Sequence, residues 1–245
     1  MSPKAGDLTG VVGLVTGGVS GIGAAITAEL RGRGATVVAV DLSARPEAAP
    51  SPGTAPDPAA WQVAGDVRDF ATMSGISAKI YDECGRLDFV VANAGITDWG
   101  SMSDGDPQRW RDVIDINVLG VAQTIRATMP VLVAQGRGHI VITASISGRT
   151  AYVGEPIYIA TKWALVGLSK ALRKEARPAG VRVSVIEPGI VDTPLVRQTA
   201  EGAAELAAVR ALDPQDVARM VTFVLAQPAH VNVDEIMVSP LGQDF

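Results

Sequence analysis

The chain contains little cysteine and histidine: Cys84 is its one cysteine, and there are two histidines among 245 residues. One cysteine cannot close an internal disulfide, and three such side chains are too few for a common structural zinc site. Runs of Lys or Arg are also missing, and 21 basic against 26 acidic residues give a net charge of −5. This balance argues against binding to nucleic acids or to anionic membranes. We therefore expect no metal site and a cytoplasmic location.

Targeting and membrane-spanning signals are absent as well. The first eight residues have no basic segment that leads into an apolar one, so we expect no signal peptide. Residues 8–28 are uncharged and long enough to cross a bilayer, but they include six glycines. A glycine-rich break would leave backbone groups without hydrogen bonds in lipid. We expect no membrane span.

Apolar residues make up 47% of the chain and charged residues 19%, which excludes an intrinsically disordered protein. Short β-branched runs predict strands at 10–16, 35–40, 61–64, 87–92, 139–143, 181–186 and 235–238. Amphipathic stretches between them predict helices at 21–33, 69–84, 107–135, 156–177 and 214–226. This alternation predicts an α/β fold: a doubly wound parallel sheet of about seven strands, with helices on both faces.

Residues 43–60 interrupt this alternation because five of them are prolines. We expect an exposed, partly extended loop there, with a proline motif for partner binding as a less favoured alternative. No repeat is visible. The length suits one domain that spans residues 1–245.

A glycine-rich turn follows the first expected strand. Gly17 permits the turn, Gly21 allows a pyrophosphate to approach the backbone, and Gly23 allows the helix to pack closely on the strand. The N-terminus of the following helix offers free N–H groups and a positive dipole to phosphates. The flanking strand and helix favour nucleotide binding over a purely structural turn.

An acidic residue, Asp41, lies 18 residues after Gly23, at the end of the second expected strand. A carboxylate there can accept hydrogen bonds from the ribose hydroxyls of NAD and repels the 2′-phosphate of NADP. A simple turn aspartate is the alternative. Asp66 follows the next strand, where it either lies near an adenine or caps the helix that begins near Asp69.

Tyr158 and Lys162 are four residues apart in an expected helix and therefore share one face. A tyrosine pKa near 10 leaves roughly one phenol in a thousand ionised at pH 7. A neighbouring ammonium group favours the phenolate, so the pair can serve as an acid/base. A surface pair of the same spacing is the alternative.

Several motifs occur together in one order: Thr16, Gly17, Gly21, Ile22 and Gly23; Asn93, Ala94 and Gly95; Asn117; Ser145; Tyr158 and Lys162; Pro188 and Gly189. Ser145 precedes Tyr158 by thirteen residues. In these motifs and spacings, residues 8 to about 195 resemble the short-chain dehydrogenase/reductase family. The resemblance implies a Rossmann fold, with 8–120 mainly binding the dinucleotide and 121–245 carrying the catalytic and substrate-binding part.

The resemblance also implies catalytic roles. Tyr158 exchanges a proton with the substrate oxygen, Lys162 lowers the tyrosine pKa and holds the nicotinamide ribose, and Ser145 polarises the carbonyl. Asn117 binds a water through a local helix distortion, and Asn93 stabilises a strand beside the cofactor. The expected cofactor contacts are Gly17, Val19, Ser20, Gly21, Ile22, Gly23, Asp41, Leu42, Asp66, Val67, Asn93, Ala94, Gly95, Tyr158, Lys162, Pro188, Gly189, Ile190 and Thr193.

We therefore expect an NAD-dependent oxidoreductase acting on a small-molecule secondary alcohol or ketone, assembled as a homotetramer or homodimer. Two alternatives are an NADPH-dependent ketoreductase or small-aldehyde/3-hydroxy-acid reductase, and a non-catalytic dinucleotide sensor. Residues 194–212 are expected to form a lid whose alanine-rich composition reveals no substrate. Trp99, Tyr152 and Trp163 are candidates for substrate contact beside Ser145 and Tyr158; His139 and Cys84 are expected to be structural.

Overall fold

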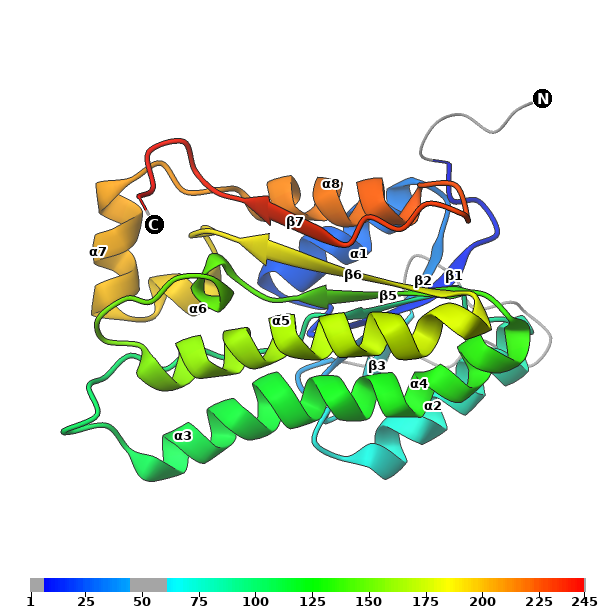
Figure 1. Ribbon diagram of the computed structural model, residues 1–245, viewed down its shortest axis with the longest axis horizontal. Coiled ribbons are helices and arrows are strands. Elements are labelled where there is room, and N and C mark those ends of the chain that lie inside the picture. The colour runs from blue at the N-terminus through cyan, green and yellow to red at the C-terminus, as the bar shows by residue number, and fades with distance from the viewer. Residues whose placement is uncertain (1–6, 45–60, 245) are drawn as a thin grey trace.

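The computed structural model describes residues 7–44 and 61–244. Within them, seven parallel strands form one sheet in the order β3-β2-β1-β4-β5-β6-β7 (Figure 1). The strands are β1 (Val12–Thr16), β2 (Thr36–Asp41), β3 (Gln62–Ala64), β4 (Phe89–Ala92), β5 (Gly138–Thr143), β6 (Val181–Pro188) and β7 (Glu235–Val238). The strand order reverses between β1 and β4. The predicted Rossmann-type sheet is confirmed, and the proline-rich stretch from residue 45 to residue 60 lies outside the described residues.

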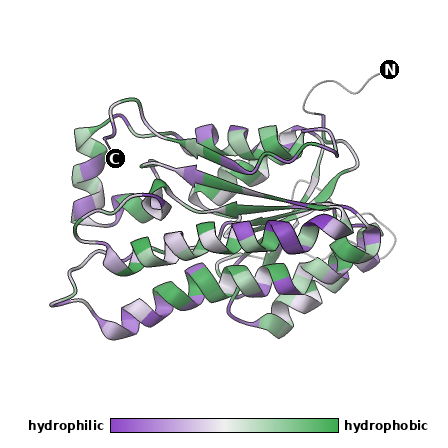
Figure 2. Cartoon of the chain, viewed as in Figure 1, coloured by the Kyte–Doolittle hydropathy of each residue, from purple (hydrophilic) through white to green (hydrophobic). Residues whose placement is uncertain are grey.

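Helices cover both faces of this sheet. One face carries α1 (Gly21–Gly32) and α8 (Pro214–Leu225), which pack against each other; the other carries α2 (Phe70–Cys84), α4 (Val121–Gln135) and α5 (Pro156–Ala176) (Figure 1). The apolar core is accordingly split in two by the sheet, with one cluster on each face. The strands are strongly hydrophobic along their lengths (Figure 2), as burial on both faces requires.

The helix starts follow from short polar residues and prolines. Asp69 caps α2 by accepting a hydrogen bond from the Ala71 N–H at 2.9 Å, and Asp106 caps α3 (Pro107–Ile114), which begins with a proline. The Asp66 carboxylate instead pairs with Arg68. The alternative in which Asp66 caps α2 is therefore wrong: Asp69 takes that role.

The expected continuous helix 107–135 is interrupted. Between α3 and α4, residues Asp115–Gly120 form a π-helix, so the segment is three consecutive helical pieces. Such π segments gather at functional sites because they displace side chains and backbone groups from the regular helical position. Asn117 lies in this π-helix and is buried.

The segment Pro107–Gln135 is also, among the described residues, the one helix long and apolar enough to span a membrane by length and composition. Its inner face packs on α2, α5 and the sheet, as the core helix of a folded domain does.

The lid region is helical. After β6 the chain forms α6 (Pro194–Arg197) and α7 (Ala200–Ala208), which lie beyond the carboxyl ends of β5 and β6 (Figure 1). Thr193 and Thr199 cap these two short helices through their hydroxyl groups.

Candidate active site

Two connected cavities open at the carboxyl edge of the sheet, where parallel α/β sheets bind ligands. The larger measures about 440 Å³ and runs from the glycine turn to α5; the smaller measures about 160 Å³ and lies under α6 and α7. Both are lined by Tyr158, together with Ile22, Ala144, Thr193 and Leu195. Tyr158 therefore stands where the two cavities meet.

The glycine turn begins the larger cavity. Gly17 and Gly21 have φ of +63° and +50°, which L side chains rarely adopt. A Cβ on Gly23 would lie 1.9 Å from the Gly17 carbonyl oxygen, so a glycine is required where α1 meets the turn. Ser20 makes no side-chain capping bond, and the first N–H groups of α1 are left without a side-chain cap. These features fit a pyrophosphate against the backbone.

Asn93 fastens the turn to the neighbouring strand. Its Nδ2 donates to the Thr16 carbonyl at 3.1 Å, while the Asn93 and Ala94 N–H groups donate to the Thr16 hydroxyl at 3.0 and 3.1 Å. These bonds join the ends of β1 and β4, where the strand order reverses. This arrangement agrees with the strand-stabilising role inferred for Asn93.

Two carboxylates lie along the wall of the larger cavity. Asp41 Oδ1 accepts hydrogen bonds from the Ser43 N–H and hydroxyl at 2.9 and 2.8 Å, which form a turn after β2. The Asp66 carboxylate accepts two side-chain bonds from Arg68, and this pairing lowers its pKa. Asp41 thus takes part in the turn after β2 and lies on the cavity wall, and its contact with a ribose stays a prediction.

The cavity linings divide the expected cofactor contacts. The larger cavity is lined by Gly17, Ser20, Gly21, Ile22, Gly23, Asp41, Leu42, Asp66, Val67, Asn93, Ala94, Gly95, Tyr158, Lys162 and Thr193. The smaller one is lined by Pro188, Gly189 and Ile190. Val19 lines neither and is a partly buried residue of the turn.

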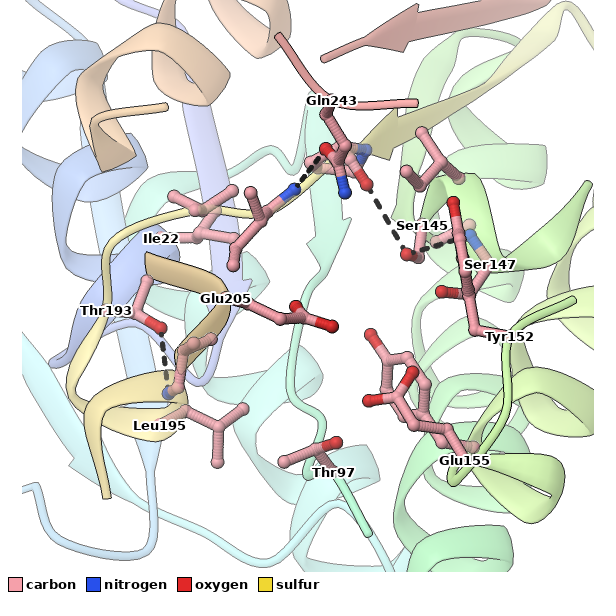
Figure 3. A pocket seen from close by; sticks show the side chains of 18 of the residues that line it. Ile22, Thr97, Ser145, Ser147, Tyr152, Glu155, Thr193, Leu195, Glu205 and Gln243 are labelled. Atoms are coloured by element: carbon pink, nitrogen blue, oxygen red, sulfur yellow. Dashed lines mark hydrogen bonds between the residues drawn. The ribbon is translucent and has the colours of Figure 1, made fainter. Parts of the chain in front are cut away.

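Ser145 lies at the end of β5, on the wall of the smaller cavity. Its hydroxyl donates to the Pro188 carbonyl at 3.4 Å and accepts from the Ser147 N–H at 3.1 Å (Figure 3). Tyr158 lines the same cavity, and the interaction of its hydroxyl with Ser145 lowers the Tyr158 pKa. These partners fix a hydroxyl beside the tyrosine, where it can contact a substrate oxygen.

Lys162 is buried and Tyr158 is partly buried, and both lie on one face of α5. The lysine Nζ lies 5.4 Å from the centre of the tyrosine ring and donates to the Thr143 carbonyl at 3.3 Å. Burial raises the pKa of Tyr158 and the Glu155 carboxylate adds to the rise, whereas the bond with Ser145 lowers it. Burial also lowers the pKa of Lys162 to about 8. Burial therefore has the largest effect on the pKa of Tyr158, and the lowering by Lys162 that the resemblance implies stays a prediction.

The Asn117 side chain is fully engaged. Its Oδ1 accepts from the Ile96 N–H at 2.9 Å, and its Nδ2 donates to the Ile96 carbonyl and to the Thr161 hydroxyl at 2.9 and 3.2 Å. Asn117 therefore clamps the loop after β4 to α5, the helix that carries Tyr158. The π-helix brings it there, which agrees with the helix distortion implied by the resemblance.

The aromatic candidates separate clearly. Trp99 and Tyr152 line the smaller cavity, whereas Trp163 is 52% exposed and lines neither cavity, so its expected substrate contact is wrong. His139 is buried and shares a 2.8 Å hydrogen bond with Ser184, as a structural residue does. Cys84 is a partly buried residue of α2.

Sequence reasoning missed five polar residues of the smaller cavity: Thr97, Ser147, Glu155, Glu205 and Gln243. Gln243 Oε1 accepts from the Ile190 N–H at 2.9 Å, so the C-terminal segment closes one side (Figure 3). Glu155 precedes α5 by one residue, a position that invites interpretation as a helix cap, but it makes no side-chain cap bond. Glu205 lies on α7, and no sequence signal indicated which face of that helix points inward.

Comparisons with known proteins agree with this geometry. A family model described as short chain dehydrogenase matches residues 11–204. An uncharacterized oxidoreductase of Staphylococcus saprophyticus is 35% identical over 237 residues, covering 96% of this chain and 99% of the relative. The crystal structure of serine dehydrogenase from Escherichia coli matches with a TM-score of 0.80 at 28% identity, over 96% of this chain and 100% of that one. Levodione reductase matches with a TM-score of 0.81 at 28% identity, over 94% and 96%.

Proposed function

The chain belongs to the short-chain dehydrogenase family, and from that basis we propose an NAD-dependent oxidoreductase that exchanges hydride with a secondary alcohol or its ketone. The family relationship and the dehydrogenase and reductase among its structural neighbours support an enzyme acting on CH–OH groups. One observation carries the finer proposal: Tyr158 lines both cavities, with Ser145 beside it and Lys162 beneath it.

In this proposal, the dinucleotide occupies the larger cavity and supplies the hydride acceptor or donor. The glycine turn and the N-terminus of α1 hold the pyrophosphate, and Asp41 accepts hydrogen bonds from the adenosine ribose. Lys162 lies at the opposite part of the cavity, beside Tyr158, where its ammonium group holds the nicotinamide ribose.

The substrate occupies the smaller cavity, with its reacting oxygen between Ser145 and Tyr158. For alcohol oxidation, Tyr158 takes the hydroxyl proton; for ketone reduction, it returns that proton to the oxygen. The Ser145 hydroxyl, held by the Ser147 N–H, turns its one hydrogen from the Pro188 carbonyl to the same oxygen. The positive charge of Lys162 favours the phenolate once the site is filled and water is excluded.

NAD is favoured over NADP by the charges on the cavity wall. Among the described residues that line it, Lys162 is the one cationic side chain, and it lies beside Tyr158 rather than Asp41. A 2′-phosphate near Asp41 would meet a like charge without a compensating cation. Arg45, the nearby cation in the sequence, lies outside the described residues.

Purified protein with NAD and a panel of secondary alcohols tests the function. We expect NADH to form, followed by its absorbance, and the reverse reaction to consume NADH with the matching ketones. The absence of turnover with every alcohol and ketone, by a protein that binds NAD, would support the non-catalytic sensor instead.

We further propose that the enzyme is a cytoplasmic homotetramer. The helices α4 and α5 would pack on their symmetry mates, because apolar side chains of α4, α5 and the π-helix remain exposed, including Leu119, Val133 and Trp163. One partly buried cysteine and no disulfide in the described residues suit a reducing compartment.

A further inference from the structure

Glu155 is a buried acid without a partner. Its exposed fraction is 7%, and its carboxylate makes no hydrogen bond or ion pair among the described residues. Buried carboxylates are normally paired, because an unpaired one is costly to keep ionised. Burial and the nearby Glu205 together raise the pKa of Glu155 to about 7. An unpaired acid on the wall of a substrate cavity indicates a ligand that supplies the missing donors.

A second carboxylate approaches the same space from the lid. Glu205 belongs to α7, and Figure 3 shows its carboxyl group directed across the cavity toward Glu155. Glu205 is an exposed residue of α7, and the loss of water on the side that lines the cavity raises its pKa. The two acids come from different elements, one before α5 and one on the lid, so they enclose the cavity rather than form a patch on one helix.

The other described residues that line the smaller cavity add no positive charge, so the two acids make its wall negative. Among the described residues that line the smaller cavity, Glu155 and Glu205 are the only charged ones. The hydroxyl of Tyr152 and the indole N–H of Trp99 are buried there without hydrogen-bond partners, and both rings line the wall. Aromatic faces and carboxylates together are the groups that recognise ammonium ions.

On the basis of the proposed function, we propose that the substrate is an alcohol or ketone that carries an ammonium group, which Glu155 and Glu205 bind from opposite sides. A protonated amine supplies N–H donors to both carboxylates while its carbinol oxygen lies between Ser145 and Tyr158. A hydroxy acid would bring a third negative charge into a cavity without a cation, so the same pair of acids rejects it. A metal ion is not favoured, since no group of three metal-ligating side chains occurs in the described residues.

Matched substrates test this inference directly. The first set is secondary alcohols with a protonated primary amine one to three carbons from the carbinol, each compared with the neutral isostere in which a methyl group replaces the ammonium group. Hydroxy acids and neutral polyols complete the panel. With NAD at pH 8, we expect kcat/KM for the best amino alcohol to exceed that of its isostere by at least about tenfold, the effect of one favourable charge contact.

Variants then assign the preference to the two acids. Glu155→Gln and Glu205→Gln should each lower the ratio of amino alcohol to isostere at least about threefold, and the double variant should bring it near one. Glu201→Gln is the matched control, because Glu201 lies on α7, is exposed and lines neither cavity; its ratio should equal that of the unmodified protein. If the double variant still prefers the amino alcohol to its isostere, the two acids do not bind the ammonium group and the assignment is overturned.

Binding separates this inference from the proposed function. In the complex with NADH, which cannot oxidise an alcohol, calorimetry should give the amino alcohol a Kd at least about tenfold below that of its isostere. Equal binding, or tighter binding of the hydroxy acid or neutral polyol, overturns the ammonium specificity even where turnover stands. Tighter binding of the amino alcohol without any turnover leaves the specificity in place and contradicts the oxidoreductase.

Discussion

Lys162 holds its Nζ 5.4 Å from the centre of the Tyr158 ring, and the two side chains share the water-poor face of α5. Burial shifts both pKa values toward the neutral forms: that of the phenol rises, and that of the ammonium falls to about 8. At pH 7 the Lys162 ammonium group is therefore still mostly charged and the Tyr158 phenol is neutral, whereas alcohol oxidation needs the phenolate. In the proposed mechanism, contacts with cofactor and substrate favour that phenolate.

Replacement of Tyr158 by Phe removes the proposed proton acceptor while keeping the ring. We expect NAD binding within about threefold of the unmodified protein and turnover lower by about 10²–10⁴, the usual contribution of acid–base catalysis. Steady-state kinetics and a fluorescence titration with NADH measure the two quantities. Turnover equal to that of the unmodified protein would rule Tyr158 out.

Replacement of Lys162 by Met should separate activity from stability. The folded pKa of about 8 lies below the usual lysine value of 10.5, so burial of the charged lysine costs stability throughout the range below pH 8. We expect Lys162→Met to raise Tm by several degrees at pH 7, with the gain vanishing toward pH 10.5, and to lower kcat/KM at least about 10²-fold. A lower Tm at pH 7 together with unchanged kinetics would contradict both roles.

Cofactor choice tests Asp41. We expect kcat/KM with NAD to exceed that with NADP at least about tenfold, which corresponds to about 1.4 kcal/mol. Asp41→Ala should narrow the ratio mainly by improving the reaction with NADP, because the like charge facing the 2′-phosphate is removed. The Ser43→Ala variant, which removes one of the two donors to Asp41 Oδ1, is the control and should keep the preference for NAD. Initial rates with both cofactors on one substrate measure this ratio. A kcat/KM with NADP equal to or higher than that with NAD would refute the preference for NAD.

Glu155 makes stability depend on pH. Its folded pKa of about 7 exceeds the usual glutamate value of 4.5, so the folded chain keeps a proton that the unfolded chain loses between these two pH values. Stability therefore falls as the pH rises from about 4.5 to 7, and the loss is complete above pH 7. The groups facing it are Glu205, Tyr152 and Tyr158, none of them cationic.

We accordingly expect Glu155→Gln to raise Tm by about 3–10 °C at pH 8, since 1 kcal/mol shifts Tm by about 2–4 °C in a domain of this size. The difference should shrink below pH 4.5, where glutamate is protonated in both states. Differential scanning fluorimetry across the pH range measures it. A variant less stable than the unmodified protein at pH 8 would mean that Glu155 has a stabilising partner.

The assembly prediction is a homotetramer. Light scattering should give the mass of four 25.4-kDa chains over a wide concentration range. Leu119→Lys and Trp163→Glu place charges on exposed apolar positions of the π-helix and α5 and should lower the mass. A monomer at every concentration would contradict the tetramer.

The sequence was sufficient for the features that depend on local pattern. Buried β-branched runs and glycine spacing indicated seven strands and the turn at Gly17, because backbone conformation there is set by adjacent residues. Glu155 and Glu205 escaped prediction because their proximity depends on how α7 folds back over the sheet, which no spacing along the chain reveals. The amphipathic pattern indicated one helix over 107–135, and only the family resemblance indicated a distortion at Asn117, because the pattern does not show where the hydrogen-bond offset changes. The rise of the Tyr158 pKa on burial was not predicted either, because the spacing of Tyr158 and Lys162 along the chain does not show how deeply the two side chains are buried.

The π-helix between α3 and α4 makes the geometry of the site depend on the number of residues in this segment. Each residue turns an α-helix by about 100°, so deleting one residue from 115–120 would restore regular winding and rotate α3 by about that angle relative to α4. Asn117 would then leave Ile96 and Thr161, and the loop after β4 would lose its attachment to α5. Single-codon deletions in this short stretch should thus abolish activity even where the deleted residue is not Asn117.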